Sequence, residues 1–246
     1  MKKLYRDFRR LIVSVPPVIA SLLIISVVGM NLMANKSINT GLDWLALDCG
    51  ILFSWLVFMC LDVLTHCYGP RTATAMSLLA LALNLLMAGL FFLASVIPGV
   101  WGESFVAGSE ALLNKALNNT FGGTWYIIFG SSVAFGVSAV LNNFLNHGIG
   151  QRLRVTGGFR QFALRSYVST FAAQFVDNLT FALIVSRVFF GWSLLQCLTC
   201  ALTGGVMELL FEVFFSPIGY RWTRGLMRAD TEAMTEDEDL SGRELI

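Results

Sequence analysis

Apolar residues follow one another along most of this chain in runs long enough to cross a lipid bilayer. A crossing helix needs about 20 mostly apolar residues, and the runs are too long for the strands of a membrane barrel. The fold class expected is therefore an all-α membrane protein with six transmembrane helices. Their expected ranges are 11–34, 44–66, 72–97, 124–146, 165–187 and 193–216.

Polar segments at both ends divide the chain into three parts. Residues 1–10 form a basic cytoplasmic lead, residues 11–228 the transmembrane domain, and residues 229–246 an acidic cytoplasmic tail expected to be disordered. Pro16 and Pro17 fall in the first third of the first helix. Because each proline lacks a backbone donor, neighbouring helices are expected to compensate for the lost hydrogen bond.

The segment 165–187 carries its polar side chains on one face. Steps of three or four residues place them there: Ser166, Thr170, Gln174, Asp177 and Phe181, widened by Ser169 and Asn178. Asp177 is expected about 18 Å from one end of the helix and about 15 Å from the other, and a carboxylate near the bilayer midplane costs roughly 2.5–3.5 kcal/mol. The stripe favours a lined cavity; the alternative is that these groups only hold neighbouring helices together.

Three further carboxylates fall in the apolar segments. Glu208 and Glu212 are four residues apart and face the same way, so one of them is expected to hold a proton or to meet a cation if they lie close. Glu212 has the alternative of extending toward the inner boundary, and Asp62 that of pairing with an arginine such as Arg71. Carboxylates, amides, hydroxyls and aromatic rings inside an apolar bundle suit a small, flat, polar molecule.

The composition agrees with a membrane protein. Hydrophobic residues make up 56% of the 246 residues and charged residues 13%, and the mean hydropathy is +0.68. A net charge of +1 argues against nucleic acid as a partner. Of the 17 Lys and Arg residues, 14 fall on one side of the expected helices, so the positive-inside rule places both termini in the cytoplasm. The apolar run after the basic start is long enough to stay in the membrane, so no cleaved signal peptide is expected.

The residues that carry catalytic or metal chemistry are sparse. Cys197 and Cys200 form a CxxC pair within a membrane helix, with no second pair and no histidine nearby, so no metal is expected. His66 and His147 fall at helix ends, where an interfacial role is expected. No protease, hydrolase or nucleotide-binding motif occurs, and neither an enzyme nor a cofactor is predicted.

Three runs of the sequence resemble a known family: LDVLTHCYGPRTA at 61–73, the run at 150–181, and MELLFEVFFSPIGY at 207–220. They are similar to the queuosine precursor transporter family, also called the vitamin uptake transporter family. The resemblance implies a multi-pass protein of the bacterial inner membrane that imports 7-deazaguanine bases, namely the nitrile and aminomethyl precursors of queuosine or queuine itself. It also implies a homodimer and a fold similar to the substrate-binding subunits of energy-coupling-factor transporters, but acting without their ATPase, as a secondary transporter. The clustered carboxylates are compatible with coupling to protons, and facilitated diffusion is the alternative.

The residues that match the most specific family positions, together with the polar face, give the expected substrate site. Its residues are Asn31, Asp62, Asn142, Thr170, Gln174, Asp177, Asn178, Phe181, Glu208 and Glu212. The chain departs from the family pattern at three of its positions, Ala139, Asn142 and Glu208, the last in place of a lysine. Glu208 is therefore expected to favour a cationic cargo, either the aminomethyl precursor or queuine, over the neutral nitrile.

Two other functions remain open. A binding subunit of an ATP-driven transporter commonly carries Ala-x-x-x-Ala in its first helix, whereas here Ala20 is followed by Ile24. A structural membrane protein would not need Asp177 and Glu208 buried together. The small residues Gly130, Ala134 and Ser138, spaced by four, are expected to pack either within one protomer or between two.

Overall fold

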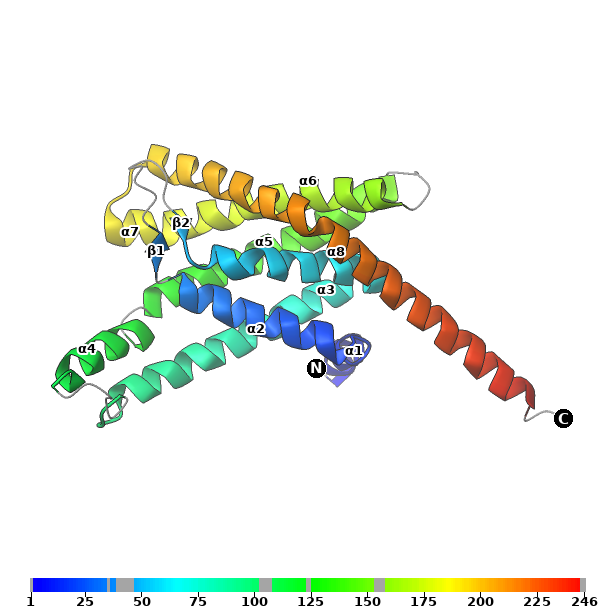
Figure 1. Cartoon of the computed structure of the whole chain (residues 1–246), viewed down its shortest axis with the longest axis horizontal. Helices are drawn as coiled ribbons and strands as arrows, with labels where there is room; N and C mark the ends of the chain where they lie inside the picture. The colour runs from blue at the N-terminus through cyan, green and yellow to red at the C-terminus, as the bar shows by residue number, and fades with distance from the viewer. Residues whose placement is uncertain are drawn as a thin grey trace.

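The computed structural model describes residues 2–34, 36–38, 47–101, 108–122, 125–152 and 158–243. These residues are almost entirely helical (Figure 1). The elements are α1 (Lys2–Val13), α2 (Pro17–Met33), β1 (Ser37–Ile38), β2 (Leu47–Asp48), α3 (Ile51–Val96), α4 (Glu110–Phe121), α5 (Trp125–Arg152), α6 (Phe159–Phe181), the π-helix η1 (Ala182–Ser186), α7 (Arg187–Phe190) and α8 (Leu194–Arg243). β1 and β2 pair in antiparallel fashion.

Four of the described helices are long and apolar enough to cross a membrane, and the bent pair of α1 and α2 makes five. α3 itself consists of two helices that meet at Gly69, where φ is 80° and ψ is 165°. Glycine adopts this left-handed conformation without strain, and Pro70 cannot donate the next helical hydrogen bond. The second half of α3 therefore folds back (Figure 1), which gives the six apolar segments that the hydrophobic pattern predicts.

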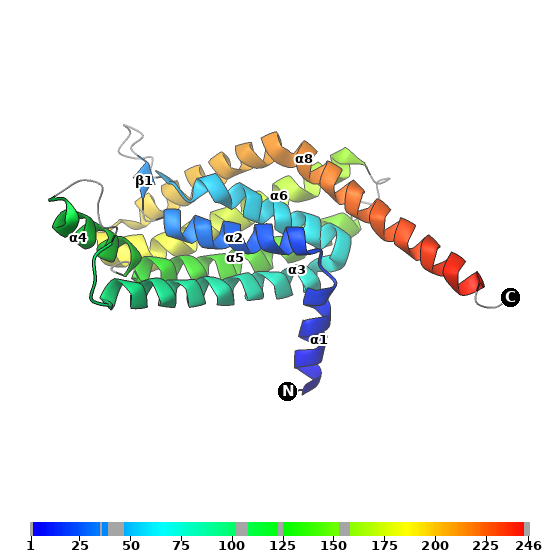
Figure 2. The same ribbon diagram turned by 60° about the horizontal axis from the view of Figure 1, so that its bottom comes forward.

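The first predicted helix, at 11–34, is wrong as a single element. α1 ends at Val13 and α2 begins at Pro17, and the axes of the two helices differ by 103°. Proline is favoured at the first position of a helix, where its missing N–H removes no helical hydrogen bond. Pro16 and Pro17 therefore mark the start of α2 and do not kink one continuous helix. α1 projects sideways from the bundle (Figure 2).

Other boundaries also differ from the sequence analysis. The second helix begins at Ile51 and not at 44; residues 39–46 lie outside the described part of the chain. The segment between the expected helices 72–97 and 124–146 contains α4. The last helix continues through Pro217 to Arg243, so its backbone is helical where disorder is expected. A proline removes one backbone hydrogen bond, and the Ala, Met, Leu and Glu residues that follow favour helix.

The hydrophobic core lies between α2, α3 and α5. It includes the fully buried Leu23 of α2, Phe58 and Leu64 of α3, and Phe135 of α5. Large apolar side chains such as Phe214 are exposed on the outer faces, while many polar side chains are buried. This distribution suits a bundle surrounded by lipid, in which the apolar outer surface faces the lipid chains and the polar groups face inward.

The small-residue stripe of α5 packs within the protomer. Ala134 and Ser138 are fully buried. A Cβ placed on Gly130 would come within 2.2 Å of Val185 Cγ2 in η1. The stripe lets α5 approach the π-helical turn closely, and it therefore offers no surface for the homodimer that the family resemblance implies.

Candidate functional site

A cavity of about 50 Å³ lies inside the bundle, between α6, α8 and the ends of α2 and α3. Five predicted site residues line it: Gln174, Asp177, Asn178, Phe181 and Glu208. Ser54 of α3 and Ser131 of α5 add two hydroxyl groups. Asp177 of α6 and Glu208 of α8 thus line the same hollow.

α6 presents four of these side chains because they recur at helical spacing. Directly after Phe181 the chain widens into the π-helix η1, an irregularity that is frequent at functional sites. Ser138 of α5 donates a hydrogen bond of 2.6 Å to Asp177 Oδ1, which fixes that carboxylate against α5. The serine thus does more than provide a small packing surface.

Two amide donors beside the cavity have no acceptor among the described residues. They are Nε2 of Gln174 and Nδ2 of Asn178, and both atoms are buried. A buried donor without a partner costs about 1–3 kcal/mol. The site therefore presents donors as well as carboxylates.

Gly204 of α8 allows Asn178 to lie at this position. A Cβ on Gly204 would come within 2.7 Å of Asn178 Nδ2 and 3.0 Å of its Cγ. The close approach of α6 and α8 at this level depends on the absence of a side chain at Gly204.

A second polar cluster lies farther along the same helices. Asp62 of α3, which is fully buried, accepts hydrogen bonds at Oδ1 from Asn142 Nδ2 (2.8 Å) and Asn146 Nδ2 (2.9 Å) of α5. Its Oδ2 accepts from Ser166 Oγ and, at 3.4 Å, from Thr170 Oγ1 of α6. Arg71, the example expected as an arginine partner of Asp62, is not among these donors; the arginine linked to the carboxylate is Arg165 of α6, through Asn146.

The same cluster includes Glu212 of α8 and Arg165 of α6. Glu212 Oε1 lies 2.7 Å from Ser166 Oγ, and its side chain is 1% exposed, so the alternative in which it extends to the boundary is wrong. Arg165 Nε donates to Asn146 Oδ1 over 2.8 Å, and one of its terminal nitrogens lies 2.8 Å from His66 Nδ1. His66 is thus a partner of a buried arginine and not only an interfacial residue.

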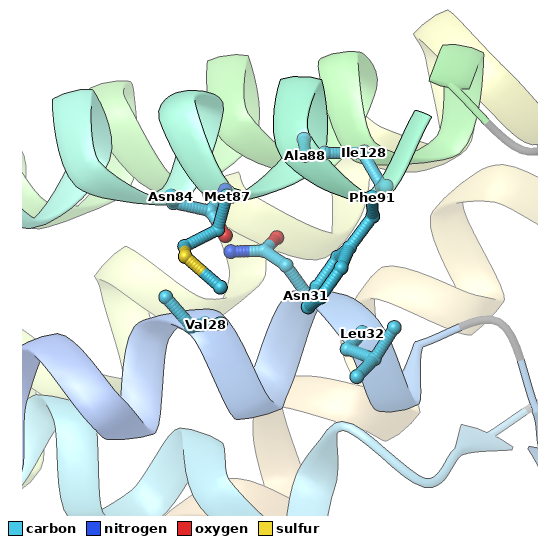
Figure 3. Close-up of a pocket in the computed structure, with 8 residues that line it drawn as sticks. All are labelled: Val28, Asn31, Leu32, Asn84, Met87, Ala88, Phe91 and Ile128. Atoms are coloured by element: carbon cyan, nitrogen blue, oxygen red, sulfur yellow. The ribbon is translucent and has the colours of Figure 1, made fainter. Parts of the chain in front are cut away.

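The ten predicted residues fall in three places, not in one chamber. Five line the cavity, and four belong to the second cluster: Asp62, Asn142, Thr170 and Glu212. Asn31 lies in a separate crevice of about 10 Å³, where its amide and that of Asn84 point toward one another (Figure 3). Asn31 Oδ1 accepts a hydrogen bond from the hydroxyl of Ser131, which lines the cavity. Asn31 thus supports a residue of the cavity wall without lining the cavity itself.

Sequence reasoning missed several residues that hold these two sites together. Asn146 and Arg165 organise the second cluster, and Ser138 and Gly204 shape the cavity. Ser166 was expected on the polar face of 165–187 but not in the substrate site. One signal was present: Asn142 and Asn146 are four residues apart in an apolar segment, so two amides face the same way. No sequence signal distinguishes Gly204 from its neighbour Gly205.

Comparison with known families identifies the class of protein. A family model described as "Putative vitamin uptake transporter" matches residues 48–222 of the 246. The chain belongs to this family. The vitamin uptake transporter match covers both polar sites, from Asp62 to Glu212, and leaves Asn31 outside. Neither the curated proteins nor the solved structures include a match.

Family membership and the apolar helices together define the general role. The chain is a multi-pass membrane protein of a transporter family, which implies a small-molecule substrate and transport instead of catalysis. The two polar sites inside its bundle are then the places where a substrate or a coupling ion would bind.

Proposed function

We propose that this transporter imports a 7-deazaguanine base, a precursor of queuosine, and binds it in the cavity between α6 and α8. The observation that carries the proposal is the pairing of carboxylates with unsatisfied amide donors in one hollow. Asp177 and Glu208 line it together with Gln174 and Asn178, whose buried nitrogens have no acceptor among the described residues.

The chemistry of a guanine-like ring is complementary to this set. A carboxylate accepts two parallel N–H bonds from the amino-pyrimidine edge, and amide N–H groups donate to the ring carbonyl and nitrogen. Phe181 offers an aromatic face on the same cavity. A bound base would thereby satisfy the donors that the bundle itself leaves without partners.

The cavity must widen before it holds such a base. A water needs about 10–15 Å³ of such volume, so the space of about 50 Å³ has room for only a few waters. Sites for drug-sized ligands are about 300–1,000 Å³. The structure thus corresponds to a closed form, and a relative movement of α6 and α8 would open the site, as alternating access requires.

Two carboxylates in one site favour a cationic cargo. The aminomethyl precursor and queuine carry an amine that Glu208 can neutralise, whereas the nitrile precursor is neutral. A hydrogen bond to a charged group is worth about 1.5–3 kcal/mol, so Glu208→Lys is expected to weaken the aminomethyl form by about 10- to 100-fold relative to the nitrile.

Binding to purified protein tests both the proposed 7-deazaguanine cargo and the proposed preference of Glu208 for a cationic base. Radiolabelled or thermal-shift binding would be measured for guanine, both precursors and queuine, with the Glu208→Lys and Glu208→Gln variants alongside. No binding of any of these bases refutes the cargo. An unchanged preference between neutral and cationic bases in Glu208→Lys refutes the role of Glu208 but not the cargo.

Transport by the chain alone is proposed over an ATP-driven complex. The Ala-x-x-x-Ala docking pattern is missing, because Ile24 follows Ala20 by four residues. Uptake in a host that lacks any energy-coupling module is the expected result. Uptake that appears only when such a module is supplied would favour the binding-subunit alternative.

A further inference from the structure

The Ser166 hydroxyl lies between two carboxyl groups and has only one hydrogen to donate. Its Oγ contacts Asp62 Oδ2, and it also contacts Glu212 Oε1 at 2.7 Å. A hydroxyl that donates to one carboxylate can only accept from the other. One of the two carboxyl groups must therefore carry a proton.

The surroundings of the two groups decide which one it is. Asp62 receives hydrogen bonds from two amide nitrogens and from the hydroxyls of Ser166 and Thr170, all of which stabilise a carboxylate. The carboxyl group of Glu212 has a hydrogen bond only with Ser166 among the described residues. Asp62 is thus the ionised group, and Glu212 donates its proton to Ser166 Oγ.

The charges on the neighbouring helices support the same assignment, in which Asp62 is ionised and Glu212 is protonated. Arginine only donates, so His66 Nδ1 of α3 must accept from Arg165 and the ring is neutral. Arg165 of α6 then balances Asp62 of α3, with Asn146 bridging them, and an ionised Glu212 of α8 would leave one negative charge unbalanced. The titratable group on α5 nearest this end, His147, lies with Gln151 at the exposed surface.

Two buried acceptor atoms of the cluster lack a donor. Glu212 Oε2 and Asn142 Oδ1 have no hydrogen-bond partner among the described residues, and both side chains are almost completely buried. A buried carboxylate with one unsatisfied oxygen is unfavourable as an anion, whereas the protonated form needs fewer donors. The environment of Glu212 accordingly suits a carboxylic acid.

We propose that Asp62, Ser166 and Glu212 form a proton-binding site, that Glu212 carries the proton in the closed form, and that its uptake and release drive import. The driving step, but not the site itself, rests on the proposed function. Glu212 lies four residues from the cavity residue Glu208, about 6 Å along α8. Loss of the proton, as Glu212–COOH gives Glu212–COO⁻ and H⁺ to water, would therefore act on the helix that closes the cavity.

Infrared spectroscopy of the purified protein in lipid at neutral pH tests the proton directly. The wild type is expected to show a carboxylic acid C=O band that Glu212→Gln removes and that the control Glu110→Gln retains. Glu212→Gln should keep the wild-type unfolding temperature, because its amide still donates to Ser166. A band that persists in Glu212→Gln while the protein stays folded overturns the assignment.

Uptake into proteoliposomes under an imposed pH gradient tests the coupling, with the aminomethyl 7-deazaguanine as probe. Wild-type protein should accumulate it above equilibrium only when the outside is acidic, and Glu212→Gln should still bind the probe but lose that accumulation. Gradient-driven accumulation by Glu212→Gln overturns the coupling. If the wild type takes up no 7-deazaguanine base while Glu212→Gln still removes the infrared band, the cargo proposal fails and the proton site stands.

Discussion

The substitution Gly204→Ala is expected to damage the cavity without unfolding the bundle. The new Cβ would lie 2.7 Å from Asn178 Nδ2, whereas ordinary contact begins at 3.4 Å. Asn178 must therefore move, and its amide is one of the two unsatisfied donors beside the cavity. A cargo that bonds to this amide would bind less well.

The substitution is expected to change both the stability of the protein and its affinity for the cargo. Overpacking costs about 1–3 kcal/mol, and alanine is favoured over glycine in a helix by about 0.8–1 kcal/mol. The net destabilisation is then about 0–2 kcal/mol. Misplacing a donor that a ligand needs costs about 1–2 kcal/mol, which weakens binding by about 5- to 30-fold.

The neighbouring glycine supplies a matched control. A Cβ on Gly205 would meet its nearest neighbours at 3.5 Å, an ordinary contact, so Gly205→Ala should bind normally and unfold at the same or a higher temperature. Radiolabel binding and thermal unfolding would be measured for both variants. Equal affinity in Gly204→Ala and Gly205→Ala would refute the role of Asn178 in the site.

Two further substitutions test the packing around the cavity. Ser138→Ala removes the 2.6 Å bond to Asp177, so it should lower stability by about 1–3 kcal/mol and weaken binding; unchanged melting and affinity would contradict this. Gly130→Ala places a Cβ 2.2 Å from Val185 and should destabilise the protomer by about 1–3 kcal/mol without changing its oligomeric state, as light scattering would show. Gly136→Ala, whose Cβ would meet a side chain only at 3.4 Å, is the control. A dimer that Gly130→Ala dissociates would show instead that the small-residue stripe packs between two protomers.

The polar face of α6 was predictable because helical spacing is a local property. Thr170, Gln174 and Asp177 share that face in the structure as they do in the sequence pattern. What each turn of the helix faces was not predictable. Thr170 meets Asp62 of α3, whereas Gln174 and Asp177 line the cavity with α8, so one stripe serves two sites.

The break between α1 and α2 shows a second limit. Pro16 and Pro17 are compatible with a kinked helix or with the end of one helix and the start of another, because both remove the same backbone donors. The structure has the second arrangement, with 103° between the two axes and with α2 packed against α3, and the prolines alone do not encode that angle.

The sequence by itself determined that this chain lies in a membrane, where its apolar helices fall, and that Gly69 and Pro70 separate two of them. These properties depend on residues close together in the chain. Only the tertiary structure decided that Asn142 binds Asp62, 80 residues away, and that Ser166 bridges Asp62 and Glu212. A hydrogen bond between helices requires two side chains to meet within about 3 Å, and that distance is set by the packing of whole helices.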